Sequence, residues 1–257
     1  MTVVTGGSQG IGRALALEFA AWGNPILLVA RRPADLAEAA KTIETAVRIK
    51  VVTVAADLAT PAGIAAIDAA LAANNGYCDV LVNNAAMGLS GPFAGHDGAA
   101  VDQLVDLNVR ALTNLMHRHL PGMLVRGHGG ILNVASLGGY LPGPHQAVYY
   151  ASKAYVISLT EAVAAENRGL GVRISVLAPG PINTAFHQEM GARGAYYATL
   201  AGLMGPNYVA RRAFRGFRWG LTVIIPGLHY RVLAHVVRVT PHPILLPVTG
   251  WLLKRRG

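Results

Sequence analysis

The chain has 257 residues, of which 53% are apolar and 14% are charged, so it has ample material for the core of one α/β domain. Its single cysteine, Cys78, excludes an internal disulfide and a cysteine-based metal cluster within one chain. The formal net charge of +9 arises in the C-terminal part, because all 13 acidic residues precede residue 190 while Lys and Arg continue to the end.

The first residues read as a strand, a glycine-rich turn and a helix. A β-branched run at 2–5 is followed by Gly-Gly-Ser-Gln-Gly-Ile-Gly at 6–12 and by helical spacing at 13–19. Glycines permit a tight turn and let the backbone approach a pyrophosphate at the helix N-terminus, where free N–H groups favour anions. Between a strand and a helix, this pattern indicates a dinucleotide-binding turn rather than a merely structural one. No basic segment followed by an apolar run stands ahead of it, so we expect a cytoplasmic protein without a secretory signal.

The second expected strand carries information on the cofactor. Residues 26–30 form a continuous apolar run, as expected for a strand buried on both faces of a parallel sheet, and Arg31 and Arg32 follow it. Dinucleotide folds that bind NAD usually carry an acid at this strand end, whereas a basic residue accommodates the 2′-phosphate of NADP. Arginine suits bidentate phosphate binding, so the pair predicts NADP(H); two solvated loop arginines are the alternative.

Helical and strand patterns then alternate along the chain. We expect helices at 35–46, 61–73, 101–120 and 149–167, the third ending at Pro121-Gly122, and strands at 51–56, 79–82, 131–135 and 172–178. Such alternation predicts an α/β fold with a Rossmann-like, doubly wound parallel sheet in a three-layer α/β/α arrangement. Within a single domain, residues 1–190 would bind NADP(H) and hold the catalytic groups. Residues 191–257 would form a substrate lid and a basic, apolar, helical C-terminal extension packed on or beside it.

Tyr149 and Lys153 lie four residues apart in an expected helix, and therefore on one face of it. A neighbouring ammonium favours the charged form of a phenol, so the pair can donate or accept a proton near neutral pH. Taken alone, such a pair is more often a surface feature. Ser136 stands at the carboxyl end of an expected strand, which is the edge at which ligands bind in such sheets.

In this order and at these spacings, the motifs resemble those of the short-chain dehydrogenase/reductase family over roughly residues 1–190. They are Thr5-Gly-x-x-x-Gly-x-Gly12, Asp57, Asn83-Asn84-Ala85, Asn108, Ser136, Tyr149-x-x-x-Lys153, and Pro179-Gly180 with Thr184. One departure is Ala86, where the family usually has glycine. The extra methyl group slightly tightens a turn near the cofactor but removes no chemical group.

The resemblance implies a catalytic set of Asn108, Ser136, Tyr149 and Lys153. Tyr149 would donate a proton to the carbonyl oxygen, and Lys153 would lower the pKa of Tyr149 and hydrogen-bond the nicotinamide ribose. Ser136 would polarise the carbonyl, and Asn108 would hold a water that links Lys153 to solvent. The cofactor would supply the hydride, and the protein would orient it.

The implied cofactor contacts follow the dinucleotide from end to end. Besides Tyr149 and Lys153, they are Gly6, Ser8, Gln9, Gly10, Ile11 and Gly12 at the pyrophosphate, Arg31 and Arg32 at the 2′-phosphate, Asp57 and Leu58 at the adenine, Asn84 and Ala85 near the central ribose, Ile182 and Thr184 at the carboxamide and diphosphate, and Pro179 and Gly180 before them. No metal is needed for this chemistry. His128 and His145 lack carboxylate or cysteine partners at ligand spacing, so we interpret them as ordinary loop residues.

The segments expected around the substrate are apolar. The loop at 137–144 carries no charged group, and the expected lid at 186–203 is rich in Ala, Gly, Leu, Met and Tyr. Family members with apolar, basic C-terminal additions often resemble reductases of long-chain acyl or steroid-like carbonyls. We therefore expect a lipophilic substrate, such as a 3-oxoacyl thioester or a steroid-like carbonyl.

The tail from residue 206 interleaves basic residues with aromatic and aliphatic ones, and Arg211, Arg215 and Arg218 share helical spacing. This pattern suggests that residues 206–257 contact a peripheral membrane surface or an anionic, lipid-like substrate. The alternative is that helices of the tail pack on the core or on a sister subunit. The apolar pieces are too short and too broken by proline to span a bilayer, and too hydrophobic for an arm that binds nucleic acid.

Three hypotheses follow from these observations. The first is an NADP(H)-dependent oxidoreductase that transfers a hydride between the nicotinamide and a carbonyl or secondary alcohol of a lipophilic substrate. A catalytically idle NADP(H)-binding sensor or scaffold is the second, although the complete set of four catalytic residues argues against it. The third is a protein that interacts with membranes through its tail. The resemblance also implies a homodimer or tetramer that pairs the helices containing Asn108 and Tyr149.

Overall fold

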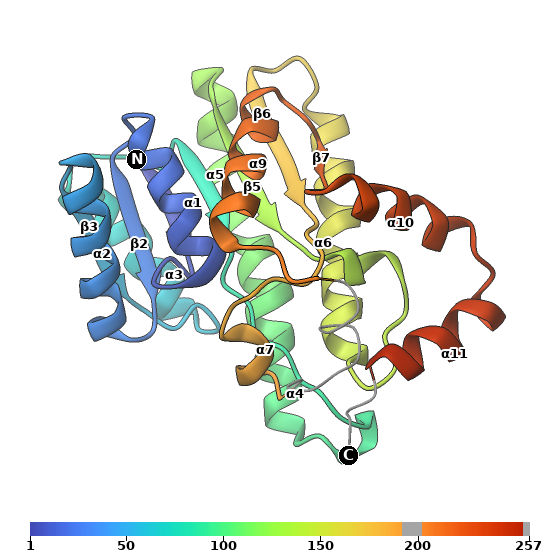
Figure 1. Cartoon of the computed structure of the whole chain (residues 1–257). Helices are drawn as coiled ribbons and strands as arrows, with labels where there is room; N and C mark the ends of the chain where they lie inside the picture. Colours follow the sequence, from blue (N-terminus) through green and yellow to red (C-terminus); the bar gives the residue numbers. More distant parts are fainter. Residues whose placement is uncertain (192–201, 254–257) are drawn as a thin grey trace.

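Seven parallel strands form the central sheet of the computed structural model, which describes residues 1–191 and 202–253 (Figure 1). The strands are β1 (Thr2–Thr5), β2 (Ile26–Ala30), β3 (Val51–Ala55), β4 (Val80–Asn83), β5 (Gly129–Val134), β6 (Val172–Leu177) and β7 (Val223–Ile224), in the spatial order β3-β2-β1-β4-β5-β6-β7. The order reverses between β1 and β4. Doubly wound folds bind their ligands at such a reversal, outside the carboxyl ends of the strands.

Helices cover both faces of the sheet, which confirms the predicted three-layer α/β/α fold. On one face α1 (Gly10–Ala21), α2 (Pro33–Val47) and α9 (Pro206–Arg218) share a hydrophobic cluster with the strands, and on the other face α3 (Pro61–Ala73), α5 (Leu112–Arg126) and α6 (Ala147–Glu166) share a second. The side chains of β1, β2 and β4 are almost entirely buried, because both of their faces are covered. This double cover explains why β2 is a continuous apolar run and why β1 and β4 are apolar apart from Thr2, Thr5 and Asn83.

The predicted helix at 101–120 is wrong in its ends and in its regularity. The structure has α4 (Gly98–Val105), a π-helical segment (Asp106–Ala111) and then α5, which passes through Pro121 to Arg126. Proline removes one backbone donor, but the buried Met123 and a hydrogen bond of 3.0 Å from Arg126 Nη2 to the Cys78 carbonyl hold the last turn in place. The helix stops at Gly127, whose φ of +67° is the left-handed conformation typical of helix ends.

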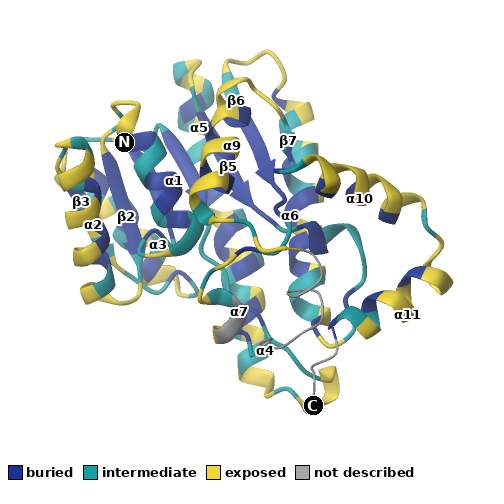
Figure 2. Ribbon diagram, viewed as in Figure 1, coloured by how far each residue is buried: buried dark blue, intermediate teal, exposed yellow. Residues whose placement is uncertain are grey.

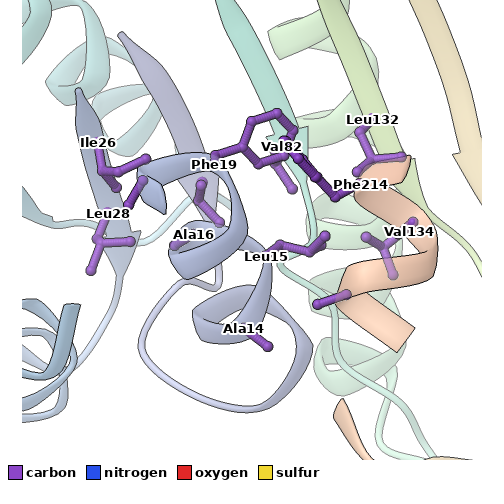
Figure 3. Packing of buried hydrophobic residues seen from close by; sticks show 14 of the residues in the cluster. Ala14, Leu15, Ala16, Phe19, Ile26, Leu28, Val82, Leu132, Val134 and Phe214 are labelled. Carbon is purple, nitrogen blue, oxygen red and sulfur yellow. The ribbon is translucent and has the colours of Figure 1, made fainter. Parts of the chain in front are cut away.

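The tail begins with a helix that belongs to the core. The rings of Phe214 and Phe217 in α9 lie edge-on to Phe19 of α1, with centroids 5.0 and 5.6 Å apart. Figure 3 shows Phe19 and Phe214 beside Val82 and Leu132 of the central strands. Such pairs contribute about 0.5–1.5 kcal/mol each beyond the area they bury. For α9, therefore, the alternative of packing on the core holds, with the aromatic rings inward and the arginines outward.

The tail also supplies a strand that the sequence did not predict. The two residues of β7 pair with Val176 and Leu177 of β6 and complete the sheet. Because β7 is so short and precedes Pro226, it has no recognisable alternation. Within the described part of the tail, the helices after β7 lie outside the three layers: α10 (Leu228–Val239) and α11 (His242–Leu253), which stand at the edge of the molecule in Figure 1.

Among the described residues, no helix combines the length and apolarity that crossing a bilayer requires.

Candidate active site

The glycine-rich turn between β1 and α1 has the backbone expected of an anion-binding turn. Gly6 and Gly10 have φ values of +61° and +56°, which residues with a side chain rarely adopt. Gly12 has no room for a side chain, since its Cβ would lie 2.1 Å from the Gly6 carbonyl oxygen. The N-cap residue Gln9 makes no side-chain hydrogen bond to α1, and the first turn contains no acidic residue. The N–H groups at this helix end therefore suit a pyrophosphate.

Asn84 ties this turn to the end of β4. Its Nδ2 donates to the carbonyl oxygens of Thr5 and Gly6, both at 3.0 Å. The backbone N–H groups of Asn84 and Ala85 donate to Thr5 Oγ1 at 2.9 and 3.0 Å. Both amide hydrogens of the Asn84 side chain are thus used within the protein. The Asn84 side chain therefore stabilises the conformation of the glycine-rich turn.

Two guanidinium groups follow β2, and only one of them is paired with a described acidic residue. Arg32 forms an ion pair with Asp35 in the first turn of α2, whereas no described residue forms an ion pair or hydrogen bond with Arg31. Asp57, at the end of β3, accepts the N–H of Ala59 at 3.1 Å. Arg31, Arg32 and Asp57 all line the same cavity. Arg31 is therefore the more available partner for an anion.

The π-helical segment positions Asn108 between two other parts of the site. Asn108 is buried, and its Oδ1 accepts the N–H of Met87 at 2.9 Å. Its Nδ2 donates to the Met87 carbonyl at 2.8 Å and to Ser152 Oγ at 3.1 Å. The side chain thus fastens the loop after β4 to α6. Asn108 does not itself line the cavity.

Lys153 is buried in α6, four residues after Tyr149. Its Nζ donates to the Val134 carbonyl, at the end of β5, at 2.9 Å. Burial lowers the pKa of the Lys153 ammonium from 10.5 to about 8. The ammonium lies 5.7 Å from the centre of the Tyr149 ring. Both side chains line the cavity, so the predicted pair is brought together at its wall.

Ser136 follows β5 and caps a short 3₁₀ helix (Leu137–Tyr140) by accepting the Gly138 N–H at 3.1 Å. The loop that continues from it packs closely on α6. A Cβ at Gly143 would lie 2.3 Å from Cγ of Tyr150, and one at Gly139 would lie 2.7 Å from the Lys153 carbonyl oxygen. These close approaches explain the glycines of this loop and fix Ser136 relative to the helix that carries Tyr149.

The turn after β6 joins the cofactor side of the cavity to α10. The Pro179 carbonyl accepts the N–H of Leu137 at 2.8 Å. A Cβ at Gly180 would lie 2.4 Å from the ring of Tyr230, which is 1% exposed and donates its hydroxyl hydrogen to the Gly202 carbonyl at 3.0 Å. Tyr230 therefore anchors α10 directly against this turn.

Two further predicted residues close this side of the site. Ile182 is buried and pairs with Met204 in an isolated parallel bridge. Thr184 lies against the glycine-rich turn, since a Cβ at Gly10 would stand 3.3 Å from Thr184 Cγ2. The short helix α7 (Phe186–Glu189) follows, and Gln9 Nε2 donates to Glu189 Oε1 at 3.1 Å. Residues 192–201 of the expected lid lie outside the described residues.

All of these groups surround one cavity of about 1190 Å³. Every predicted cofactor residue except Gly12 lines it, as do Ser136, Tyr149 and Lys153 among the predicted catalytic residues. The described charged residues of the wall are Arg13, Arg31, Arg32, Asp57, Lys153 and Glu189. None of them comes from the far end, which is built by the loop at 137–146 and by α10 and α11.

Sequence reasoning missed the residues of that far end. The apolar wall there is formed by Leu141, Tyr230, Leu233, Val236, Val237, Ile244, Leu245, Val248 and Leu252. Apolar residues three or four positions apart along 230–252 were the available signal. Gln146 was also missed: it is 2% exposed, lines the cavity, and its Nε2 has no hydrogen-bond partner among the described residues. A buried, unpartnered amide cannot be recognised from sequence.

The two histidines interpreted as loop residues lie away from any metal-like cluster. His128 does have a carboxylate partner, contrary to expectation, because its Nδ1 lies 2.9 Å from Asp79 Oδ1. The backbone of His145 has a φ of +66°, and its carbonyl accepts the Gly91 N–H at 2.8 Å. Among the described residues, no group of three or more His, Cys, Asp or Glu side chains could hold a metal ion.

Comparison with known proteins places the chain among dehydrogenases and reductases. The family described as short chain dehydrogenase matches residues 1–194. The ketoacyl reductase HetN of a Nostoc species is 30% identical over 224 residues, which cover 87% of this chain and 77% of that protein.

Two solved structures share nearly the whole fold. A short-chain dehydrogenase from Sphingobium yanoikuyae in complex with NADPH has a TM-score of 0.82 at 30% identity and covers 91% of this chain and 92% of its own. A short chain dehydrogenase/reductase from Burkholderia phymatum in complex with NAD has a TM-score of 0.82 at 28% identity and covers 96% of this chain and 94% of its own. The likeness therefore extends well beyond residue 194.

Proposed function

Because the chain belongs to the short-chain dehydrogenase/reductase family, and is thus an NAD(P)-type oxidoreductase acting on alcohol and carbonyl groups, we propose that it transfers a hydride between NADP(H) and a lipophilic carbonyl or secondary alcohol. The observation that carries the proposal is the polarity of the cavity. Arg31 and Arg32 line it after β2, the Tyr149–Lys153 pair lines it on α6, and the described residues that α10 and α11 contribute are mostly apolar and carry no charge.

The residues present fit a nicotinamide dinucleotide. The uncapped N-terminus of α1 and the left-handed backbone of Gly6 and Gly10 suit its pyrophosphate, and all other residues predicted to contact the cofactor except Gly12 line the same cavity. When bound, the cofactor supplies or accepts the hydride. The protein contributes binding, orientation and the transfer of a proton.

In the direction of reduction, the Tyr149 hydroxyl donates its proton to the carbonyl oxygen as charge develops there. The Lys153 ammonium favours the resulting phenolate, because the two groups share one face of α6 and the ammonium is buried without an acidic partner among the described residues. Ser136 Oγ donates a hydrogen bond to the same carbonyl oxygen. Oxidation of an alcohol uses the same groups in reverse.

Asn108 acts as a positioning residue. Both hydrogens of its side-chain amide are occupied by Met87 and Ser152. A water relay from Lys153 to solvent at this point therefore uses the second lone pair of Asn108 Oδ1 or its backbone carbonyl. The π-helical segment, a feature frequent at functional sites, places these atoms beside α6.

NADP(H), rather than NAD(H), is proposed from the end of β2. Arg31 has no partner among the described residues. Asp35, in the first turn of α2, forms its ion pair with Arg32 instead. An acid able to accept the 2′-hydroxyl of NAD is missing from the two positions after the strand. A guanidinium group instead matches a phosphate with two parallel hydrogen bonds.

A lipophilic substrate is proposed from the far wall. Nine apolar side chains there come from the loop after β5, α10 and α11, and none of the described residues beside them in the wall is charged. Leaving a buried amide unpaired costs about 1–3 kcal/mol, so a substrate acceptor opposite Gln146 Nε2 would offset that cost. A second oxygen beside the reacting carbonyl, as in a 3-oxoacyl thioester or an oxygenated steroid-like ring, provides such an acceptor.

The test measures NADPH oxidation in the presence of apolar ketones and 3-oxoacyl thioesters. The loss of the nicotinamide absorbance gives the rate. Tyr149→Phe should lower kcat by about 10²-fold or more while the Kd for NADPH changes only a few-fold. Tyr150→Phe is the matched control, because it removes the hydroxyl of a neighbouring tyrosine that also lines the cavity, and it should keep turnover. Equal loss in both variants would refute the assigned acid. Tight NADPH binding by the wild-type protein without turnover on any carbonyl would favour the sensor or scaffold.

We also propose a homodimer or tetramer, as the family resemblance implies, that pairs the helices containing Asn108 and Tyr149: the π-helical segment that continues into α5, and α6. Tyr155 of α6 is 38% exposed, and its hydroxyl lies 2.9 Å from Thr113 Oγ1 of α5, so the two helices present a joint surface. Sedimentation velocity measures the state directly. Membrane contact, expected over residues 206–257, is confined to α10 and α11 in this proposal, because the aromatic rings of α9 are in the core.

A further inference from the structure

α10 is apolar on two opposite sides. Tyr230, Ala234 and Val237 are buried on the side that faces the body of the protein. Leu228, Val232 and Val239 lie on the opposite side, because spacings of four and seven residues return to one face of a helix. They are 76%, 55% and 82% exposed, and they form what we term the outer face of α10. Figure 2 shows the exposed side of this helix turned away from the sheet.

α11 also carries exposed apolar side chains, beside its buried ones. Leu245 and Thr249 are buried, whereas Ile244 and Val248 are 61% and 51% exposed. Single exposed apolar residues are normal on protein surfaces, but a run of them along two consecutive helices marks an interaction site. The two helices that carry these residues lie outside the three layers (Figure 1).

The charges beside this face have one sign. From residue 206 to the end, the sequence contains Lys and Arg but no acidic residue. Arg231 Nε donates to the Ile225 carbonyl at 3.0 Å, and no described acidic residue pairs with it. Arg238 lies 3.7 Å from Glu161 of α6 and covers the ring of Tyr140. The flank of α10 therefore keeps a positive charge next to exposed apolar side chains.

These charges decide between two candidate partners for the outer face of α10: a second copy of the chain and a lipid bilayer. A two-fold contact of this face with a second copy would bring arginines against arginines, since neither side offers an acid from the same segment. A bilayer with anionic lipids supplies both matching parts: phosphate and carboxylate groups for Arg231, and the acyl boundary for Leu228, Val232 and Val239. The geometry therefore points to contact along the surface of the bilayer.

The same helices form the mouth of the cavity. Leu233, Val236, Ile244 and Val248 line the cavity and are also at least 42% exposed. Apolar surface thus continues from the outer face into the substrate end of the site. A lipophilic molecule can pass along it without leaving an apolar environment.

We propose that α10 and α11 dock the protein on an anionic membrane surface, from which the lipophilic substrate enters the cavity. The docking rests on the exposed residues alone. Only the entry of the substrate rests on the proposed function.

Co-sedimentation of the full chain with vesicles tests the docking. Wild-type protein should bind vesicles of phosphatidylcholine with phosphatidylserine, and added salt should weaken the binding. The triple variant Leu228→Ser, Val232→Ser, Val239→Ser should bind at least about tenfold more weakly, because it loses the inserted apolar area. The matched control is Val125→Ser with Leu170→Ser, since these residues are 89% and 52% exposed but lie away from α10. The control should bind like the wild type.

Three outcomes would overturn the docking. Equal binding of the triple variant and the wild type, or binding of neither, excludes docking through this face. A change of sedimentation coefficient of the triple variant without lipid would assign the face to a second copy. Turnover of a small water-soluble ketone without vesicles separates the two proposals: the triple variant does not touch the cavity wall and should match the wild type. If neither the wild type nor the triple variant turns over the ketone, but the two differ in vesicle binding, the proposed function fails and the docking stands.

Discussion

Lys153 has the most unusual electrostatic environment of the described site. Its ammonium is 3% exposed and is held by one carbonyl, that of Val134, without an acid in contact. Burial lowers its pKa to about 8, so the charged form that would assist Tyr149 is costly to keep in the folded protein. The site thus gives up some stability for a cation next to the phenol.

Lys153→Met should remove this cost together with activity. Between about pH 8 and pH 10.5 the unfolded chain holds more protons at this position than the folded protein does, so the group makes the wild-type protein more stable as pH rises. At neutral pH the variant should therefore be more stable, by on the order of 1–3 kcal/mol, and the difference should shrink toward pH 10.5. Denaturant unfolding across pH measures it. A difference that does not depend on pH would contradict the buried ammonium.

Arg31→Ala should weaken NADPH binding by about ten- to a hundredfold and leave NADH binding nearly unchanged, because only NADPH carries the 2′-phosphate. Arg32→Ala is the matched control. Its guanidinium already pairs with Asp35, so the loss of NADPH affinity should be smaller. Fluorescence titration with each cofactor gives the two ratios. Equal losses for NADPH and NADH in Arg31→Ala would refute the assignment.

At the scale of elements, α9 shows how a basic helix can be misread. Arg211, Arg215 and Arg218 share one stripe, but the residues between them decide where the helix lies. Phe214 and Phe217 are 7% and 3% exposed, whereas the arginines are exposed to solvent. A charged stripe on a helix therefore predicts a solvated face, and the apolar stripe opposite predicts what the helix packs against.

Phe214→Ala should destabilise the fold by about 3–5 kcal/mol, since it opens a cavity between α1 and α9. Trp219→Ala, one residue past the helix end, should change the unfolding free energy by less than about 0.5 kcal/mol, because Trp219 is 77% exposed. Chemical denaturation of both variants measures the contrast. A similar small effect in both would mean that α9 does not belong to the core.

Elements formed by local pattern were predicted well, and those fixed by distant contacts were not. The strands β1 to β6 were predicted from short runs rich in Val, Ile, Leu and Thr, and β2 is a continuous apolar run because both of its faces are buried. The passage of α5 through Pro121 depends on what Met123 and Arg126 contact, and neither contact can be read from neighbouring residues. The two residues of β7 form a strand only because β6 is beside them.

At the scale of the whole molecule, the predicted cofactor residues do gather at one cavity, because the carboxyl ends of parallel strands meet at one edge of the sheet. Their assigned roles remain proposals. What could not be predicted is the other half of the cavity. It is built by α10 and α11, whose position depends on Tyr230 filling the space above Gly180. A packing contact of this kind has no sequence motif from which it could be predicted.

The short last strand also bears on how the protein behaves at high concentration. β7 is an edge of the sheet, and long exposed edges recruit strands from other copies and seed aggregates. Here the edge is two residues long and is followed by Pro226, which has no N–H to donate. The edge therefore offers few free backbone N–H and C=O groups with which a strand of another copy could pair. A chain with so apolar a tail thus avoids one route to fibrils through the brevity of a single element.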